Sequence, residues 1–164
     1  MKKLNVLVLL MVLSLAGCGD GRPAVVPISG TVTLNGDPVE GVTVMFVVEE
    51  VADGYARPSA GKTDAQGKFT ISTYGNEDGM PVGKYKVGFI KKELLSKAPE
   101  NEYSENPEAS LKSIKYKWHT PRNVADPNES GITAEVTKNG LEPATFALEG
   151  GGDIETDGVM ANEP

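Results

Sequence analysis

The chain has 164 residues, enough for one folded domain with appendages, and its 39% hydrophobic and 24% charged residues are typical of a globular protein. Its net charge of −7 repels nucleic-acid phosphates and anionic membrane surfaces, so neither is an expected electrostatic partner. The single cysteine excludes an internal disulfide and a cysteine-rich zinc site, and the single histidine argues against catalytic triads and multi-histidine metal sites. We therefore expect no cofactor and no metal.

Residues 1–17 have the layout of a secretory signal peptide. Two lysines follow the first methionine, and the apolar run over residues 4–15 is shorter than the roughly 20 residues of a membrane-spanning helix. The run ends in Leu15-Ala16-Gly17-Cys18, which resembles the bacterial lipobox. That resemblance implies cleavage before Cys18, lipidation of its sulfur and acylation of its new amino group. Cleavage leaves 14 basic and 23 acidic residues, a net charge of −9.

Lipidation of Cys18 predicts an extracytoplasmic protein anchored to a bacterial membrane. Acyl chains contribute about 0.8 kcal/mol per buried CH₂, so several of them hold a protein there permanently. The alternative is an ordinary signal peptide whose cysteine lies near the cleavage site by chance. After cleavage, residues 18–27 form a short tether. Gly19 stands where the enteric inner-membrane retention signal has aspartate, which favours the outer membrane.

Two strands are expected over residues 28–34 and 42–48. Both segments alternate with period two and are rich in valine and threonine, the pattern of half-buried strands. The residues between them, Asn35-Gly36, Asp37-Pro38 and Gly41, are typical of turns. Because two strands cannot bury their apolar faces alone, more sheet must follow.

More strands are expected after a loop over residues 49–57. A turn built on Asp64, with Gly67 in the left-handed conformation, leads into the first of them. A calcium loop is not indicated there, because it would alternate several oxygen ligands before its glycine. Residues 83–90 alternate again. The side chains expected to point inward from these two strands are Phe69, Ile71, Thr73, Tyr85, Val87 and Phe89.

Three motifs occur in order over about residues 28–90: SGTVTLNGDPVEGVTVMF, GKTDAQGKFTIST and PVGKYKVGF. Together they resemble the carboxypeptidase regulatory-like domain, a transthyretin-like fold of secreted and lipid-anchored bacterial proteins. The resemblance implies an all-β, prealbumin-type Greek-key β-sandwich of about seven strands over residues 28–149. It is evidence for the fold and not for chemistry, because one fold carries many functions.

An insertion interrupts the domain at about residues 91–131, with a helical turn expected over residues 92–97. Alternation over residues 115–119 places Tyr116 and Trp118 on one side and His119 on the other. Strands over residues 132–137 and 144–148 complete the sandwich. The Gly-rich, acidic residues 150–164 are expected to be a disordered tail.

The insertion holds the candidate ligand-binding residues. Tyr103, Tyr116 and Trp118 are either a platform for a sugar or peptide, or they pack the insertion onto the sandwich. His119 with the nearby Arg122 and Asp126 is a weak catalytic candidate, because there is no second histidine and no identifiable nucleophile.

Enzymes of related fold do not match this chain. Transthyretin-like hydroxyisourate hydrolases use several histidines and a C-terminal Tyr-Arg-Gly-Ser motif, and this chain has neither. No peptidase domain accompanies the regulatory-like domain. We therefore predict a non-enzymatic, lipid-anchored module of the cell envelope with a structural or protein-interaction role. The alternatives are a carbohydrate- or peptide-binding lipoprotein that uses Tyr116, Trp118 and His119 and, more distantly, a hydrolase. The expected partners are the membrane through Cys18 and an envelope protein or glycan.

Overall fold

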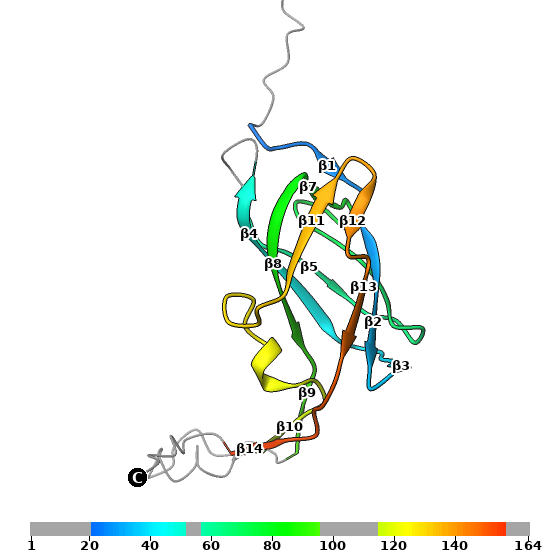
Figure 1. Ribbon diagram of the computed structural model, residues 1–164, viewed down its shortest axis with the longest axis vertical. Helices are drawn as coiled ribbons and strands as arrows, with labels where there is room; N and C mark the ends of the chain where they lie inside the picture. Colours follow the sequence, from blue (N-terminus) through cyan, green and yellow to red (C-terminus); the bar gives the residue numbers. More distant parts are fainter. Residues whose placement is uncertain (1–20, 52–56, 96–114, 157–164) are drawn as a thin grey trace, which may run out of the picture.

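A computed structural model describes residues 21–51, 57–95 and 115–156 (Figure 1). These residues form strands, turns and a short 3-10 helix, η2 (Arg122–Val124), and there is no α-helix among them. The predicted all-β class is therefore confirmed for this part of the chain. The predictions for Cys18 and Tyr103 fall outside the described residues.

Two sheets pack face to face as a β-sandwich. The strands of the larger sheet are β4 (Thr43–Val51), β5 (Ser59–Lys62), β8 (Gly83–Ile90), β11 (Thr133–Thr137) and β12 (Gly140–Glu142). The strands of the smaller sheet are β2 (Ser29–Leu34), β3 (Asp37–Pro38), β6 (Lys68–Thr70) and β13 (Thr145–Leu148). The larger sheet has the order β12-β11-β8-β4-β5; the smaller has the order β13-β2-β3, and β6 also pairs with β2. The chain crosses between the sheets several times, so each sheet combines strands from separate parts of the sequence.

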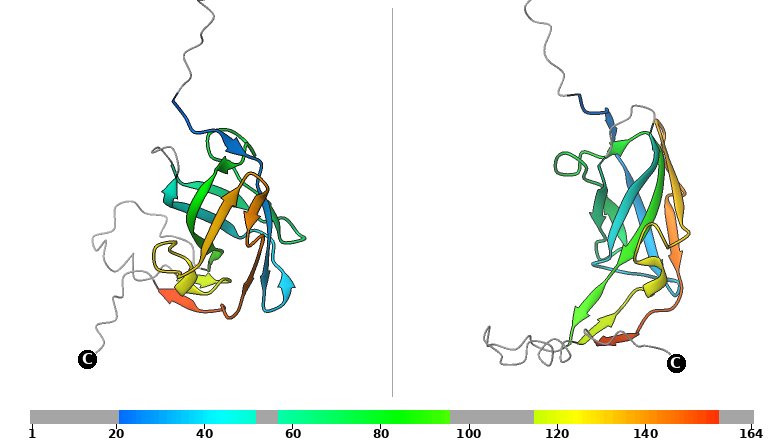
Figure 2. Two further views of the ribbon diagram at one scale, coloured as in Figure 1. Left: turned by 45° about the horizontal axis from the view of Figure 1, so that its top comes forward. Right: turned by 90° about the vertical axis from the view of Figure 1, so that its left-hand side faces the viewer.

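Two further small sheets lie at opposite ends of the sandwich (Figures 1 and 2). At the end where the chain enters, β1 (Val25–Val26) pairs with β7 (Met80–Pro81). At the far end, β9 (Lys92–Leu94), β10 (Lys115–Trp118) and β14 (Ile154–Thr156) form a sheet with the order β14-β10-β9. Only Lys91 separates β8 from β9, so the far sheet continues directly from the sandwich.

The core lies between the two large sheets and consists of the side chains that the alternation pointed inward. The larger sheet contributes the fully buried side chains of Phe46, Tyr85 and Phe89. The smaller sheet contributes Val32, which is fully buried, and Phe69, which is almost fully buried. A fully buried side chain of this size contributes roughly 1.5–3 kcal/mol. The Phe146 ring packs against the rings of Phe46, Phe69 and Phe89, with centroids 5.1 to 6.5 Å apart.

The predicted turns are present, and glycine, asparagine and aspartate residues stabilise their backbone conformation. Asn35 and Gly36 both have positive φ, at 53° and 90°, where β2 turns into β3. In the next turn Gly67 has a φ of 72°, and the Asp64 carboxylate accepts the backbone N–H groups of Gln66 and Lys68. Since these donors occupy the Asp64 carboxylate, this turn is structural.

Three segments differ from the predictions. β4 continues to Val51, into the expected loop, because it pairs with β8 along its whole length. The segment expected to start a helical turn is β9, whose partner β10 begins 21 positions after β9 ends. Within the expected disordered tail, Gly150 to Gly152 all have positive φ and lead into β14, which pairs with β10. The last two differences have one cause, since both strands depend on a distant partner.

The segment from η2 to Gly131 covers part of the larger sheet's outer face. A Cβ atom on Gly88 would lie 2.7 Å from the carbonyl oxygen of Ala125 and from the Pro127 ring, so only glycine permits this contact. The Ser130 hydroxyl donates to the carbonyl of Val87. The outer face is thus covered at the η2 end of β8 and open toward β7.

Candidate functional site

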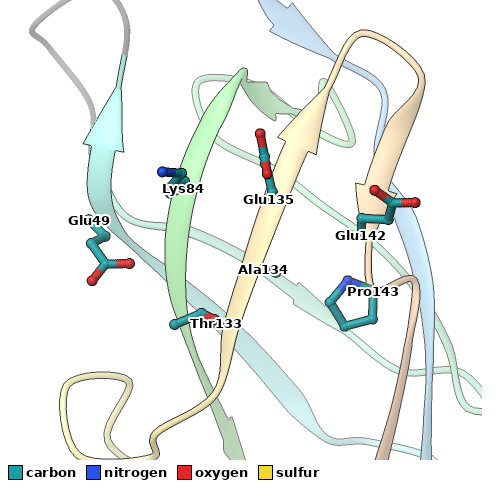
Figure 3. A pocket seen from close by; sticks show the side chains of 7 residues that line it. All are labelled: Glu49, Lys84, Thr133, Ala134, Glu135, Glu142 and Pro143. Atoms are coloured by element: carbon teal, nitrogen blue, oxygen red, sulfur yellow. The ribbon is translucent and has the colours of Figure 1, made fainter.

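A shallow pocket of about 300 Å³ lies on the open part of the larger sheet's outer face (Figure 3). Strands β4, β8, β11 and β12 contribute its lining, which bears three carboxylates and one ammonium group. The lining residues are Glu49, Lys84, Thr133, Ala134, Glu135, Glu142 and Pro143.

The strand register gives the pocket a row of charges. Glu135 is directly opposite Lys84 on one side and Glu142 on the other. Like charges in such a pair destabilise a sheet by about 0.2–1 kcal/mol, whereas the Lys84–Glu135 pair is favourable. The carboxylates of Glu49, Glu135 and Glu142 point in different directions (Figure 3). The part of the chain that the structure describes has no group of three or more side chains arranged to hold a metal ion.

The predicted aromatic pair lies in the far sheet. Tyr116 and Trp118 share one face of β10, as the alternation predicted, and the register places Leu94 and Lys92 of β9 opposite them. On the other side of β10, Glu155 of β14 is opposite Tyr116. The pair is therefore flanked by two strands that were not predicted.

Charged side chains surround the Trp118 ring. The Lys92 ammonium nitrogen lies 5.4 Å from the Trp118 ring centroid and 4.5 Å from that of Tyr116. The Arg122 guanidinium carbon lies 5.7 Å from the Trp118 ring. The Glu155 carboxylate accepts the indole N–H at 2.7 Å with one oxygen and the Arg122 guanidinium at 2.8 Å with the other. We refer to Lys92, Tyr116, Trp118, Arg122 and Glu155 as the Trp118 cluster.

The Trp118 cluster favours packing over ligand binding. Trp118 is only 8% exposed, its indole N–H has a partner, and two cations lie over its ring. A sugar platform needs an exposed ring face, which Trp118 does not offer. Tyr116 is half-buried, with Lys92 over its ring. The sequence pointed to this pair but not to Lys92 and Glu155, because no local pattern shows which strands will flank β10.

His119 belongs to a separate arrangement. Its Nε2 lies 2.9 Å from a carboxylate oxygen of Glu93, and its backbone N–H donates to the carbonyl of Lys91. Arg122 pairs with Glu155, while the Asp126 carboxylate accepts the backbone N–H of Asn128. The residues suggested as a catalytic cluster thus each have a different partner.

Thr120 fixes the junction between the sandwich and the far sheet. This residue is fully buried, and its hydroxyl donates to the carbonyl of Phe89 at 3.2 Å and accepts the N–H of Lys91 at 3.0 Å. Both partners lie where β8 passes into β9. The hydroxyl therefore satisfies backbone groups that the change of sheet would leave without partners.

Two groups at the β1–β7 end have shifted pKa values. Burial, together with the neighbouring Tyr74 hydroxyl, raises the pKa of Tyr85 to about 12, and its hydroxyl donates to the carbonyl of Pro81. Burial works to raise the pKa of Asp78, but backbone N–H bonds from Thr73, Tyr74 and Gly75 outweigh it and lower the pKa below 3.8. The Asp78 carboxylate thus holds the 74–79 loop, and the Tyr85 hydroxyl is bound to Pro81 of β7, so both groups already have structural partners.

None of the described helical structure is long and apolar enough to cross a membrane. Comparisons of the chain with protein-family models, with curated proteins and with solved structures find no match.

Proposed function

We propose that this protein is a bacterial lipoprotein, a non-enzymatic β-sandwich module that acyl chains on Cys18 attach to a membrane of the cell envelope, the outer membrane being preferred. Its role is structural or one of protein interaction. The observation that carries the proposal is the order of segments: an apolar run, the lipobox Leu15-Ala16-Gly17-Cys18 and then, after a few residues, β1 of the folded sandwich. The folded module therefore begins close to the predicted lipid anchor, as expected for a lipoprotein.

We further propose a transthyretin-like Greek-key sandwich of the carboxypeptidase regulatory-like type. Support comes from the way the three sequence motifs are used. Their turn residues Asn35, Gly36 and Gly67 have positive φ, and their apolar positions fill the core between the two sheets. A sandwich of this type has about seven main strands, and the described strands of two or three residues account for the larger number here.

The geometry supports a non-enzymatic role. His119, Arg122 and Asp126 have separate partners, while Asp78 binds backbone groups of the 74–79 loop and Tyr85 binds the carbonyl of Pro81 in β7. The charged pocket presents carboxylates that point apart, without a nucleophile and a base in hydrogen-bond contact.

Incorporation of labelled palmitate into the protein expressed in a bacterium tests the proposal. We expect label in the wild type and none in Cys18→Ala, because this variant has no sulfur at position 18 to carry lipid. Cys18→Ser replaces the same sulfur by oxygen in a side chain of similar size and should also remain unlabelled. Label that persists in both variants would refute lipidation at Cys18.

The second candidate function is binding of a carbohydrate or peptide by Tyr116 and Trp118. What favours it is that the half-buried Tyr116 ring lies beside the exposed Leu94 on the same face of the far sheet. Because Trp118 is the only tryptophan, its fluorescence reports on this face directly. A glycan array combined with titration of Trp118 fluorescence tests this function. A saturable change in fluorescence with one ligand supports binding, and no response to any ligand favours the structural role.

A further inference from the structure

We propose that the end of the sandwich formed by β1, β7 and the 74–79 loop faces the lipid bilayer, so that the β9-β10-β14 sheet points away from it. This inference rests on the proposed lipidation of Cys18 and adds an orientation to it. The two ends of the folded body differ, because one binds the incoming chain and the other exposes apolar side chains.

The first described residues are fastened to one end of the sandwich. Val25 and Val26 pair with Pro81 and Met80. Ahead of them, the Arg22 guanidinium carbon lies 5.4 Å from the Tyr74 ring centroid, within the range of a cation–π contact. Within the predicted tether over residues 18–27, the part from Arg22 onward is therefore attached to the body.

Glycine at position 79 makes this attachment possible. Its φ is 93°, and a Cβ atom there would collide with the carbonyl group of Val26 and lie 2.9 Å from the Cα of Pro27. Any larger residue at position 79 would push β1 away from β7. The 74–79 loop is thus shaped to accept the incoming chain.

The remaining tether is short compared with the body. An extended chain spans at most about 3.6 Å per residue, so the Cα of Cys18 lies within about 14 Å of that of Arg22. From Gly83, beside β7, to Leu94 in the far sheet, β8 and β9 extend at roughly 3.3 Å per residue and cover about 36 Å. An anchor at Cys18 therefore holds the β1–β7 end at the bilayer, while the far sheet lies beyond its reach (Figure 1).

Charge opposes the body lying flat on the bilayer. The mature chain has 14 basic and 23 acidic residues, which anionic lipid headgroups repel. At the far sheet, Leu94, Leu95 and Ile154 are 50%, 47% and 64% exposed. The competing arrangement is one in which these apolar side chains enter the lipid, and it predicts the opposite orientation.

Two single-cysteine variants of the full lipidated chain distinguish the orientations. Asn76→Cys places a thiol in the exposed 74–79 loop, and Ile154→Cys places one in the far sheet. Lipidation of the Cys18 sulfur blocks that thiol, so each variant carries one reactive thiol. Each is labelled with a fluorophore and reconstituted into vesicles of phosphatidylcholine and phosphatidylglycerol that contain a lipid with a chelated transition-metal quencher. We expect several-fold stronger quenching at position 76 than at position 154. Equal quenching, or stronger quenching at position 154, overturns the orientation.

Flotation of the same vesicles separates this inference from the proposed function. If the wild type does not float with the vesicles, or if an unlipidated chain that starts at residue 19 still does, the proposed anchoring fails. If flotation depends on Cys18 but position 154 is quenched as much as position 76, only the orientation fails. Gly79→Val in the Asn76→Cys background provides a control, because it should release β1, lengthen the tether and reduce quenching while flotation is retained. Unchanged quenching in a folded Gly79→Val variant would contradict the role of the β1–β7 attachment.

Discussion

Asn35 and Gly150 are joined by two hydrogen bonds across 115 positions of the sequence. The Asn35 side-chain amide donates to the Gly150 carbonyl at 3.3 Å, and its oxygen accepts the Gly150 N–H at 2.8 Å. The side chain thus imitates the backbone of a neighbouring strand. It extends the pairing of β2 with β13 by one step, at the point where the chain leaves the sandwich for β14.

Replacing Asn35 by glycine should weaken this connection. Asn35→Gly removes both side-chain hydrogen bonds but tolerates the positive φ, so its effect isolates the bonds. We expect a loss of about 1 kcal/mol in the free energy of unfolding, measured by urea denaturation. Asn35→Asp keeps the acceptor for the Gly150 N–H and should lose less. A glycine variant as stable as the wild type would show that the bonds contribute nothing.

The two tyrosines at the β1–β7 end should respond in opposite ways to loss of their hydroxyls. The Tyr74 hydroxyl is buried and has no hydrogen-bond partner among the described residues, whereas that of Tyr85 donates to Pro81. Because an unsatisfied buried group costs about 1–3 kcal/mol, Tyr74→Phe should leave stability unchanged or raise it by up to about 1 kcal/mol. Tyr85→Phe leaves the Pro81 carbonyl without its partner and should destabilise by about 1–2 kcal/mol. Thermal unfolding of both variants tests the contrast, which a destabilised Tyr74→Phe would contradict.

Asp78 should make stability depend on pH in the acid range. Its pKa in the folded protein lies below its ordinary value of 3.8, so the charged form stabilises the fold above that pH. This contribution is lost as the pH falls below 3.8 and through the lowered pKa. Asp78→Asn, which cannot accept all three N–H groups, should lose about 2 kcal/mol at neutral pH.

The pH profile provides the control for Asp78. Urea denaturation of the wild type and Asp78→Asn should give a stability difference that shrinks steadily below pH 3.8. A difference that stays constant with pH would show that the carboxylate charge is not responsible.

The Trp118 cluster should loosen when Glu155 is removed. Glu155→Ala deletes the acceptor of the indole N–H and the partner of Arg122, whereas Glu155→Gln can still accept the indole N–H. We expect red-shifted Trp118 emission and stronger acrylamide quenching in Glu155→Ala, together with a loss of about 1 kcal/mol in stability. Glu155→Gln should lie between this variant and the wild type. Identical spectra in all three proteins would show that Trp118 does not depend on Glu155.

Much of the sandwich was predictable because its signals are local. Phe69, Ile71, Tyr85, Val87 and Phe89 are buried as their alternation predicted, since side chains one position apart on a strand point to opposite faces. The turns at Asn35 and Asp64 were predictable for the same reason, because only a few residue types accept a positive φ or bond to the nearby backbone.

The far sheet and its Trp118 cluster were not predictable in this way. β14 is three residues long and lies in a Gly-rich, acidic stretch whose composition resembles a disordered tail. Its strand conformation depends on pairing with β10, which begins 39 residues earlier, and no local pattern specifies that pairing. The same pairing brings Glu155 to Trp118 and Arg122.

The sequence by itself thus determined the all-β class, the inward and outward faces of the main strands, and the residues of the tight turns, because each depends on a few neighbouring side chains. It also predicts the lipid anchor. Only the tertiary structure decided that the incoming chain is fastened through Arg22 and Gly79 to one end of the body, and that Trp118 is enclosed by charged groups at the other. These arrangements depend on contacts between segments far apart in the chain, and the free energy of such contacts is determined by how the sheets pack.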